Sequence, residues 1–227
     1  MSANAPQDGL GSRSNGSLLV YPDTDGKPMA ENEVQLFLMM ALIAHLRAKF
    51  GGPDAHVGGD MFWYPVEGEP HTVQAPDVFV VFGRAQEPKR SSWKQWEEGG
   101  HPHDLVIEVV SPSNSWADLA RLLRFYERYG VREYVVLDPE RGQVMVFRRV
   151  SGELSLVADE NVSDLARLRF EPIEGRIDVT DLDLGRVLEP HEMRALVDSE
   201  RERADAAVAR VTELEAKLRA LGIDPNS

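Results

Sequence analysis

The hydrophobic pattern of the 227-residue chain changes twice along its length. From Glu31 to Lys49 apolar side chains recur at roughly helical spacing, and the run stops at Gly51–Pro53, which predicts a long amphipathic helix. Short runs rich in β-branched and aromatic residues follow, and these predict strands. They are residues 56–66, 77–82, 105–110, 133–138, 144–147 and 154–157. A second helix is predicted from Trp116 to Tyr129, after the capping and turn residues Ser111–Ser115. This order of elements predicts an α/β domain with a mixed sheet flanked by helices.

The two ends of the chain differ from this central domain, which we place at residues 18–188. Residues 1–17 are rich in Ser, Gly and Asn, and we expect a disordered tail because so few apolar side chains cannot offset the entropy of ordering. Residues 189–227 are predicted to be a coiled-coil helix and tail, since a heptad period runs through residues 193–221. The seam positions are Val197, Ala204, Val211 and Leu218, with Glu200, Ala207, Leu214 and Leu221. Such a helix favours a homo-oligomer or docking on the same protomer, and a frayed, solvated helix is the alternative.

Composition narrows the class of protein. The chain has 38 acidic and 25 basic residues, a net charge of −13, which disfavours nonspecific coating of nucleic acid, so any contact with DNA has to be local. No apolar run is long enough to span a membrane, and the N-terminal residues lack the pattern of a secretory signal, so we expect no membrane association and a cytoplasmic location. The chain has no cysteine, so a bound metal would need oxygen or imidazole ligands.

Two acidic residues lie where strands are predicted. Glu108 is the one charged residue in the apolar run 105–110, and burying a carboxylate in an interior strand is unfavourable unless a cation or hydrogen-bond donors meet it. Asp77 opens the preceding strand, after Ala75 and Pro76. If the two strands pair, both carboxylates converge at one end of the sheet, where they could hold Mg²⁺ or Mn²⁺. The alternative is an ordinary Asp at a strand start and a Glu neutralised by a salt bridge.

Six blocks of the sequence, taken together and in order, resemble the Uma-two family, a large bacterial group in the restriction-endonuclease-like, PD-(D/E)XK superfamily. The blocks are Gly26–Asn32, Gly59–Gly68, Ala75–Val78, Trp93–Gly99, Glu108–Asn114 and Phe125–Tyr134. The resemblance covers residues 18–190. It implies a restriction-endonuclease-like fold and a Mg²⁺-dependent endonuclease that hydrolyses phosphodiester bonds in DNA.

The resemblance also implies roles for particular acidic residues. Asp77 matches the Asp of the family's Pro-Asp half-motif, and Glu108 matches the carboxylate of the second half, so both are expected to hold the metal and to take part in catalysis. Glu31, on the first helix, stands where superfamily members often carry an additional acidic residue. Asp60 lies in a block that looks like one shared by close relatives. Both are further candidates as metal ligands.

The Lys of the motif is missing. In this family it is expected on the helix after the second carboxylate, four residues before the Tyr that matches Tyr126, and that position is Leu122. A cation there would stabilise charge in the transition state, which Leu cannot do. Arg121 and Arg124 are candidate catalytic substitutes, and a solvated helix face is the alternative. Because position 122 is leucine, we also consider a second function. The protein would be a catalytically lapsed nuclease fold that acts as a nucleic-acid-binding or oligomeric assembly module.

Two further signals are weaker. Trp93 and Trp96 lie in a polar, cation-containing segment that could clamp a nucleic-acid strand, and a purely structural loop is the alternative. His101 and His103 flank a proline like a pair of metal ligands, but we interpret them as surface residues.

Overall fold

The computed structural model describes most of the domain and part of the C-terminal segment. The described residues are 13–14, 17–24, 30–111, 113–158, 160–187 and a set of single positions and short runs between 192 and 215. The chain divides into two compact units, residues 1–187 and 188–227. Within the predicted tail, Arg13–Ser14 (β1) pairs with Ser17–Leu18 (β2), and the other residues of that tail lie outside the described ones.

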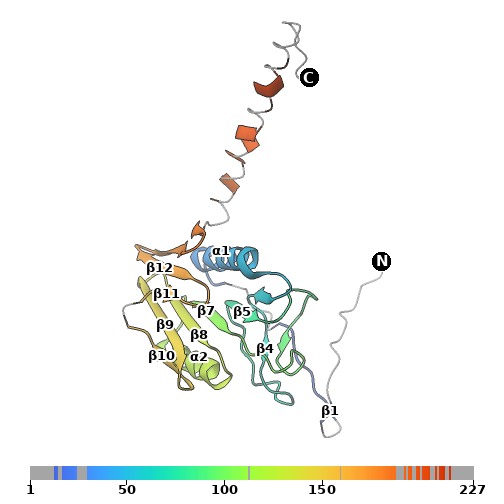
Figure 1. Cartoon of the computed structure of the whole chain (residues 1–227). Coiled ribbons are helices and arrows are strands. Elements are labelled where there is room, and N and C mark those ends of the chain that lie inside the picture. Colours follow the sequence, from blue (N-terminus) through green and yellow to red (C-terminus); the bar gives the residue numbers. More distant parts are fainter. Residues whose placement is uncertain are drawn as a thin grey trace, which may run out of the picture. The chain divides into compact units, whose positions relative to one another are not determined.

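A six-stranded mixed sheet forms the centre of the first unit (Figure 1). In spatial order its strands are β10 (Glu153–Leu156), β9 (Gln143–Val150), β8 (Glu133–Asp138), β7 (Leu105–Val109), β5 (Val78–Phe82) and β3 (Ala55–Gly58). Strands β7 and β8 are parallel and the other neighbours are antiparallel. All residues of β7 and β8 are buried, as expected of interior strands, and they include the acidic residues Glu108, Glu133 and Asp138. The predicted mixed α/β architecture is confirmed.

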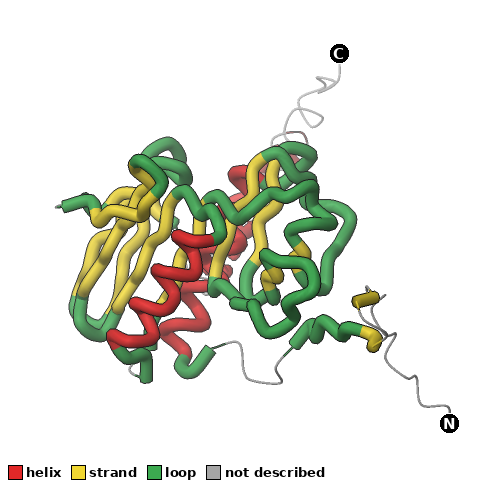
Figure 2. Tube along the Cα trace, turned by 90° about the horizontal axis from the view of Figure 1, so that it is seen from below, coloured by secondary structure: helices red, strands yellow, loops and turns green. Residues whose placement is uncertain are grey.

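Two helices cover opposite faces of this sheet (Figures 1 and 2). Helix α1 (Glu33–Phe50) begins at Asn32, whose side chain accepts a hydrogen bond from the Gln35 amide, and it packs against β3, β5 and β7. Helix α2 (Trp116–Arg128) begins with a capping box between Ser115 and Asp118. It buries Leu122 and Tyr126 against the other face of the sheet. The cap of α2 fixes where the first turns of this helix meet the ends of the strands.

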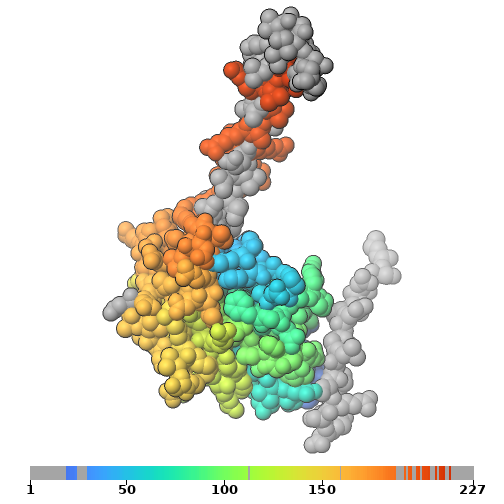
Figure 3. Space-filling model, viewed as in Figure 1, coloured from blue at the N-terminus to red at the C-terminus, as the bar shows by residue number. Residues whose placement is uncertain are grey.

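A second sheet was not predicted from the sequence. It contains β11 (Val162–Ser163), β12 (Leu168–Ile173), β13 (Arg176–Asp181) and β14 (Gly185–Arg186), all antiparallel. Figure 3 shows it beside α1 on the surface of the molecule. The buried carboxylate of Asp181 accepts hydrogen bonds from Lys49 at 2.8 Å and is 2.7 Å from the ring of His45, so it joins this sheet to α1. Strands β11 and β14 have two residues each, and β12 and β13 each bury only two apolar side chains, which explains why the sequence pattern is weak.

The predicted strand at 56–66 is in fact two strands. Strand β3 ends at Gly58, and β4 (Trp63–Tyr64) pairs in parallel with β6 (Trp93–Lys94). Between them the chain passes so close to the segment before β5 that a Cβ atom on Gly59 would lie 2.2 Å from the Asp77 carbonyl oxygen. Asp60 follows with a φ of 49°. A continuous strand cannot pass through this backbone contact.

The described positions between 192 and 215 are helical, and they include Ala204 and Val211 of the predicted seam. The other six seam positions lie outside the described residues. Among the residues that the structure describes, no helix is long and apolar enough to cross a membrane.

Candidate active site

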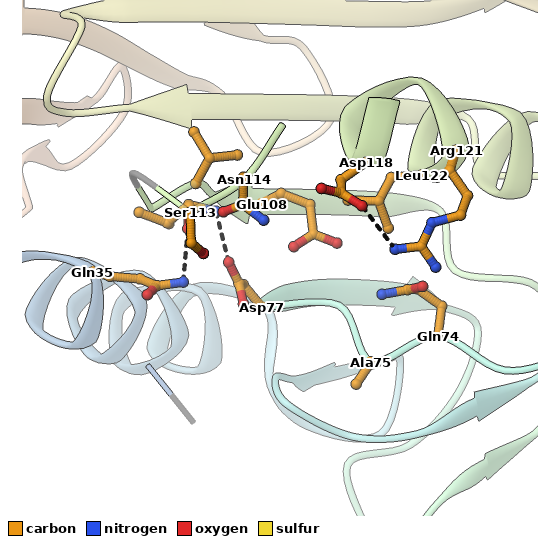
Figure 4. Close-up of a pocket in the computed structure, with 12 residues that line it drawn as sticks. Gln35, Gln74, Ala75, Asp77, Glu108, Ser113, Asn114, Asp118, Arg121 and Leu122 are labelled. Carbon is orange, nitrogen blue, oxygen red and sulfur yellow. Dashed lines mark hydrogen bonds and ion pairs between the residues drawn. The ribbon is translucent and has the colours of Figure 1, made fainter. Parts of the chain in front are cut away.

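The register of two central strands brings Asp77 and Glu108 together. Val78 of β5 pairs with Ile107 of β7, so the residue before Val78 comes opposite the residue after Ile107. Both carboxyl groups face one cavity of about 330 Å³ (Figure 4). Helix α1, the segment before β5, the loop after β7 and the first turns of α2 surround it. The convergence expected from strand pairing is therefore present.

The two carboxyl groups are held by different donors. The Val109 amide donates a hydrogen bond of 2.8 Å to Asp77 Oδ2. The Tyr126 hydroxyl donates to Glu108 Oε1 inside the protein. Burial raises the pKa of Asp77 from its ordinary 3.8 to about 6. Burial, and then the negative charge of Asp77, raises the pKa of Glu108 well above its ordinary value. Glu108 is buried and Asp77 is half-buried, and the pair resists carrying two negative charges at once.

Gln35 supports this centre from α1, and the sequence analysis did not identify it. Its side-chain nitrogen donates to the Val109 carbonyl at 2.8 Å, and its side-chain oxygen accepts from the Glu31 amide at 2.9 Å. Gln35 therefore fixes the peptide segment whose N–H binds Asp77. A glutamine among the apolar residues of the predicted helix was the available signal, because a buried amide needs partners.

The two further acidic candidates do not line the cavity. Glu31 accepts hydrogen bonds from the hydroxyl groups of Ser111 and Ser113, at 2.5 and 2.7 Å to Oε2, and these bonds lower its pKa. Asp60 is exposed, although its charge contributes to the raised pKa of Asp77. Within the described part of the chain, no group of three or more His, Asp or Glu side chains is arranged to hold a metal ion. The structure brings together two of the four candidate ligands.

Leu122 lies at the wall of the cavity and is only 6% exposed, because it packs with Val110 and Tyr126. Of the described residues that line the cavity, Arg121 alone is positively charged, and its guanidinium is 3.5 Å from Asp118. Arg124 is exposed and does not line this cavity. Of the two arginine candidates, Arg121 therefore lies at the cavity and Arg124 does not.

Trp93 and His103, two ring residues singled out in the sequence, are packed inside the protein. Trp93 is fully buried, and its indole N–H donates to the His101 carbonyl at 3.1 Å, so it is not available to clamp a nucleic-acid strand. The interpretation of His103 as a surface residue was wrong. Its ring is fully buried between Phe79 and Trp63, at centroid distances of 4.0 and 4.3 Å. His101 is exposed, as expected. His103 is buried and His101 exposed because His103 stacks on rings from two strands. The spacing of residues along the chain does not reveal such stacking.

A mixed sheet whose adjacent central strands bring two carboxylates to one polar cavity is a restriction-endonuclease-like arrangement. The model of the Uma2 family, described as putative restriction endonuclease, matches residues 12–180, and the chain belongs to this family. Among solved structures, a putative nuclease of the DUF820 group from Anabaena variabilis is similar, with 13% identity and a TM-score of 0.43. That match covers 66% of this chain and 76% of the other. No curated protein matches the chain.

Proposed function

We propose that this protein is a divalent-metal-dependent nuclease that hydrolyses phosphodiester bonds in DNA, with Asp77 and Glu108 holding the metal. The adjacent acidic side chains of buried Glu108 and half-buried Asp77 support this most directly. Among the described residues, no Lys, Arg or His side chain forms an ion pair with either carboxylate. Two adjacent carboxylates without a basic partner are unfavourable in a protein interior unless they are protonated or bind a cation.

The donor set fits a hard divalent cation. Mg²⁺ in phosphoryl-transfer sites is often bound through one or two carboxylates, and water and substrate phosphate complete its coordination. The cavity of about 330 Å³ beside the pair leaves room for both. When bound, the cation would neutralise the pair and stabilise negative charge on the reacting phosphate.

Other residues of the chain would position these two ligands. The Val109 amide orients Asp77, and the Tyr126 hydroxyl orients Glu108. Arg121 would supply positive charge at the opposite wall, where the family's Lys is replaced by Leu122. Its ion pair with Asp118 is exposed and therefore weak, so its guanidinium can exchange Asp118 for a phosphate.

Mg²⁺- or Mn²⁺-dependent nicking of supercoiled plasmid and of single-stranded DNA tests the proposal. Asp77→Asn and Glu108→Gln preserve the shape of each side chain, and each is expected to reduce cleavage by about a hundredfold or more. Glu171→Gln, an exposed position on β12, is the matched control and is expected to leave cleavage unchanged. Full activity in both site variants would remove these residues from the mechanism.

A lapsed nuclease fold is the second candidate, and the burial of Leu122 favours it. The wall from which a lysine would act is apolar here, and the net charge of −13 disfavours broad contact with DNA. The protein would then bind nucleic acid locally, or assemble, without cleaving. Robust turnover by the wild-type protein would exclude this function.

We also propose self-association through residues 193–221. Val211, a position of the predicted seam, is 55% exposed in the single chain, and a heptad helix gains stability by burying such positions against a partner. Sedimentation velocity of the full chain and of a chain truncated after residue 190 tests this. We expect the oligomer to be lost on truncation, and an unchanged oligomeric state would contradict the proposal.

A further inference from the structure

The cavity has two chemically different walls (Figure 4). The carboxyl groups of Asp77 and Glu108 form one wall. Figure 4 draws the Arg121 guanidinium and the Gln74 side-chain amide on the other side of the cavity, beyond the Glu108 carboxyl, with the Asp118 carboxylate 3.5 Å from the guanidinium. An acidic wall facing a donor wall is complementary to a cation that carries a phosphate group. The cation would lie beside the carboxylates, and the phosphate oxygens would face the donors.

Gln74 is held in place by its backbone. Its N–H donates to the Trp63 carbonyl at 3.2 Å, and its carbonyl accepts from the Trp63 N–H at 2.8 Å. Trp63 is itself fully buried and stacks on His103 at 4.3 Å, so this anchor is rigid. These bonds fix the backbone of Gln74 three residues before Asp77, and its side chain lines the cavity.

The Gln74 amide has no hydrogen-bond partner among the residues that the structure describes, which separates it from two other glutamines. Gln35 uses its side-chain nitrogen and oxygen in contacts to the backbone. The Gln95 side chain accepts from the Trp63 indole at 3.1 Å and donates to the Gly100 carbonyl at 2.9 Å. A glutamine with an anchored backbone, whose amide remains available inside a polar cavity, is suited to contact a ligand.

We propose that Gln74 and Arg121 together form the phosphate-binding wall of this cavity, with the Gln74 amide donating a hydrogen bond to a nonbridging phosphate oxygen. The inference rests on the proposed function and deepens it. Leu122 offers no hydrogen-bond donor. The phosphate would instead be bound by the cationic Arg121 on α2 and the neutral Gln74 in the segment before β5. Because the Gln74 contribution is a donor N–H, a carboxylate at this position would repel the phosphate.

Titration calorimetry of the full chain with inorganic phosphate, with and without Mn²⁺, tests the inference apart from cleavage. We expect phosphate to bind only with Mn²⁺. Gln74→Ala should weaken phosphate binding about tenfold, as loss of a hydrogen bond to a charged group does, and Gln74→Glu should weaken it further. The affinity for Mn²⁺ itself should stay the same in Gln74→Ala, because the amide is not a metal ligand. Gln143→Ala, an exposed position on β9, is the matched control.

The outcomes separate this inference from the nuclease proposal. A wild-type protein that binds phosphate through Gln74 but does not nick DNA would overturn the nuclease proposal and support the phosphate wall. Equal phosphate affinity in Gln74→Ala and wild type would overturn the role of Gln74. Absence of phosphate binding by the wild-type protein in saturating Mn²⁺ would overturn it as well.

Discussion

The Tyr126 hydroxyl donates a hydrogen bond to the Glu108 carboxyl group in the interior of the protein. This bond links α2 to β7 directly beneath the candidate active site. The ring of Tyr134 lies 5.0 Å from that of Tyr126 and is equally buried, but its hydroxyl has no partner among the described residues. The two tyrosines thus form a matched pair in which one hydroxyl group is bonded and the other is not.

Removing each hydroxyl should therefore have opposite consequences. Tyr126→Phe leaves a buried carboxyl oxygen without its donor, and we expect the free energy of unfolding to fall by about 1–3 kcal/mol. Tyr134→Phe removes a buried polar group that has no partner, so stability should be unchanged or should rise by about 1 kcal/mol. Urea denaturation of both variants at neutral pH measures the difference. Equal losses in the two variants would show that the hydrogen bond to Glu108 does not contribute.

The acidic pair should make stability depend on pH. The pKa of Asp77 is raised from 3.8 to about 6, so in the folded protein the pair keeps protons that the unfolded chain has already released. Stability contributed by the protonated pair is complete below about pH 4 and is lost as the pH rises through 6. The glutamine of the Glu108→Gln variant cannot ionise. We therefore expect this variant to have a higher melting temperature than the wild-type protein at pH 8 in EDTA. Calorimetry measures the two melting temperatures. A lower melting temperature for Glu108→Gln than for wild type would show that the ionised pair does not destabilise the folded protein.

Divalent metal should reverse this effect in every protein that keeps both carboxylates of the pair. A metal that binds the folded state at a hundred times its Kd stabilises it by about 2.7 kcal/mol. We expect Mn²⁺ to raise the melting temperature of wild type and of the Glu171→Gln control, but not of Asp77→Asn. The readout requires no substrate, so it applies whether or not the site still cleaves DNA. An equal shift in Asp77→Asn would place the metal elsewhere.

Leu122→Lys distinguishes an active site from a lapsed one. A lysine at this position of the cavity wall would offer its ammonium group to a phosphate beside Glu108. If the site has lapsed through loss of this cation, Mg²⁺-dependent nicking should increase by about tenfold or more. Leu119→Lys, on the same helix but outside this cavity, is the control for adding charge to α2. A folded Leu122→Lys protein that remains inert would show that the loss of lysine is not what limits the site.

His103 should make the fold sensitive to acid. Burial, and then the charge of His56, lowers the pKa of His103 well below 6.5, so the folded protein keeps this ring neutral while the unfolded chain takes up a proton. Stability is therefore present above about pH 6.5 and is lost as the pH falls. We expect His103→Leu to reduce the slope between pH 6.5 and 5 by up to about 1.4 kcal/mol per pH unit, measured by urea denaturation. The exposed His71→Leu is the control, and an unchanged slope in His103→Leu would contradict the assignment.

Much of the central fold could be predicted because its elements carry strong local patterns. The interior strand at 105–110 differs from β7 (Leu105–Val109) by one residue, and the helix at 116–129 differs by one from α2 (Trp116–Arg128). The second sheet was missed because β11 and β14 have only two residues each, and β12 and β13, which have six, each bury only two apolar side chains on their strand face. With so few apolar positions in a strand, the alternation of apolar and polar residues is too brief to recognise.

By itself the sequence determined a set of candidate carboxylates, Asp77 and Glu108 with Glu31 and Asp60, and the leucine at position 122. Asp77 and Glu108 stand out because a charged residue beside or within an apolar strand is unfavourable, and the residue at position 122 can be read directly. The tertiary structure decided which groups meet those carboxylates. Tyr126 and Gln35 donate around the pair, and Gln74 faces it, because strand register and helix packing bring together residues up to 74 positions apart. Contacts of that kind depend on the whole packed core, and no local spacing encodes them.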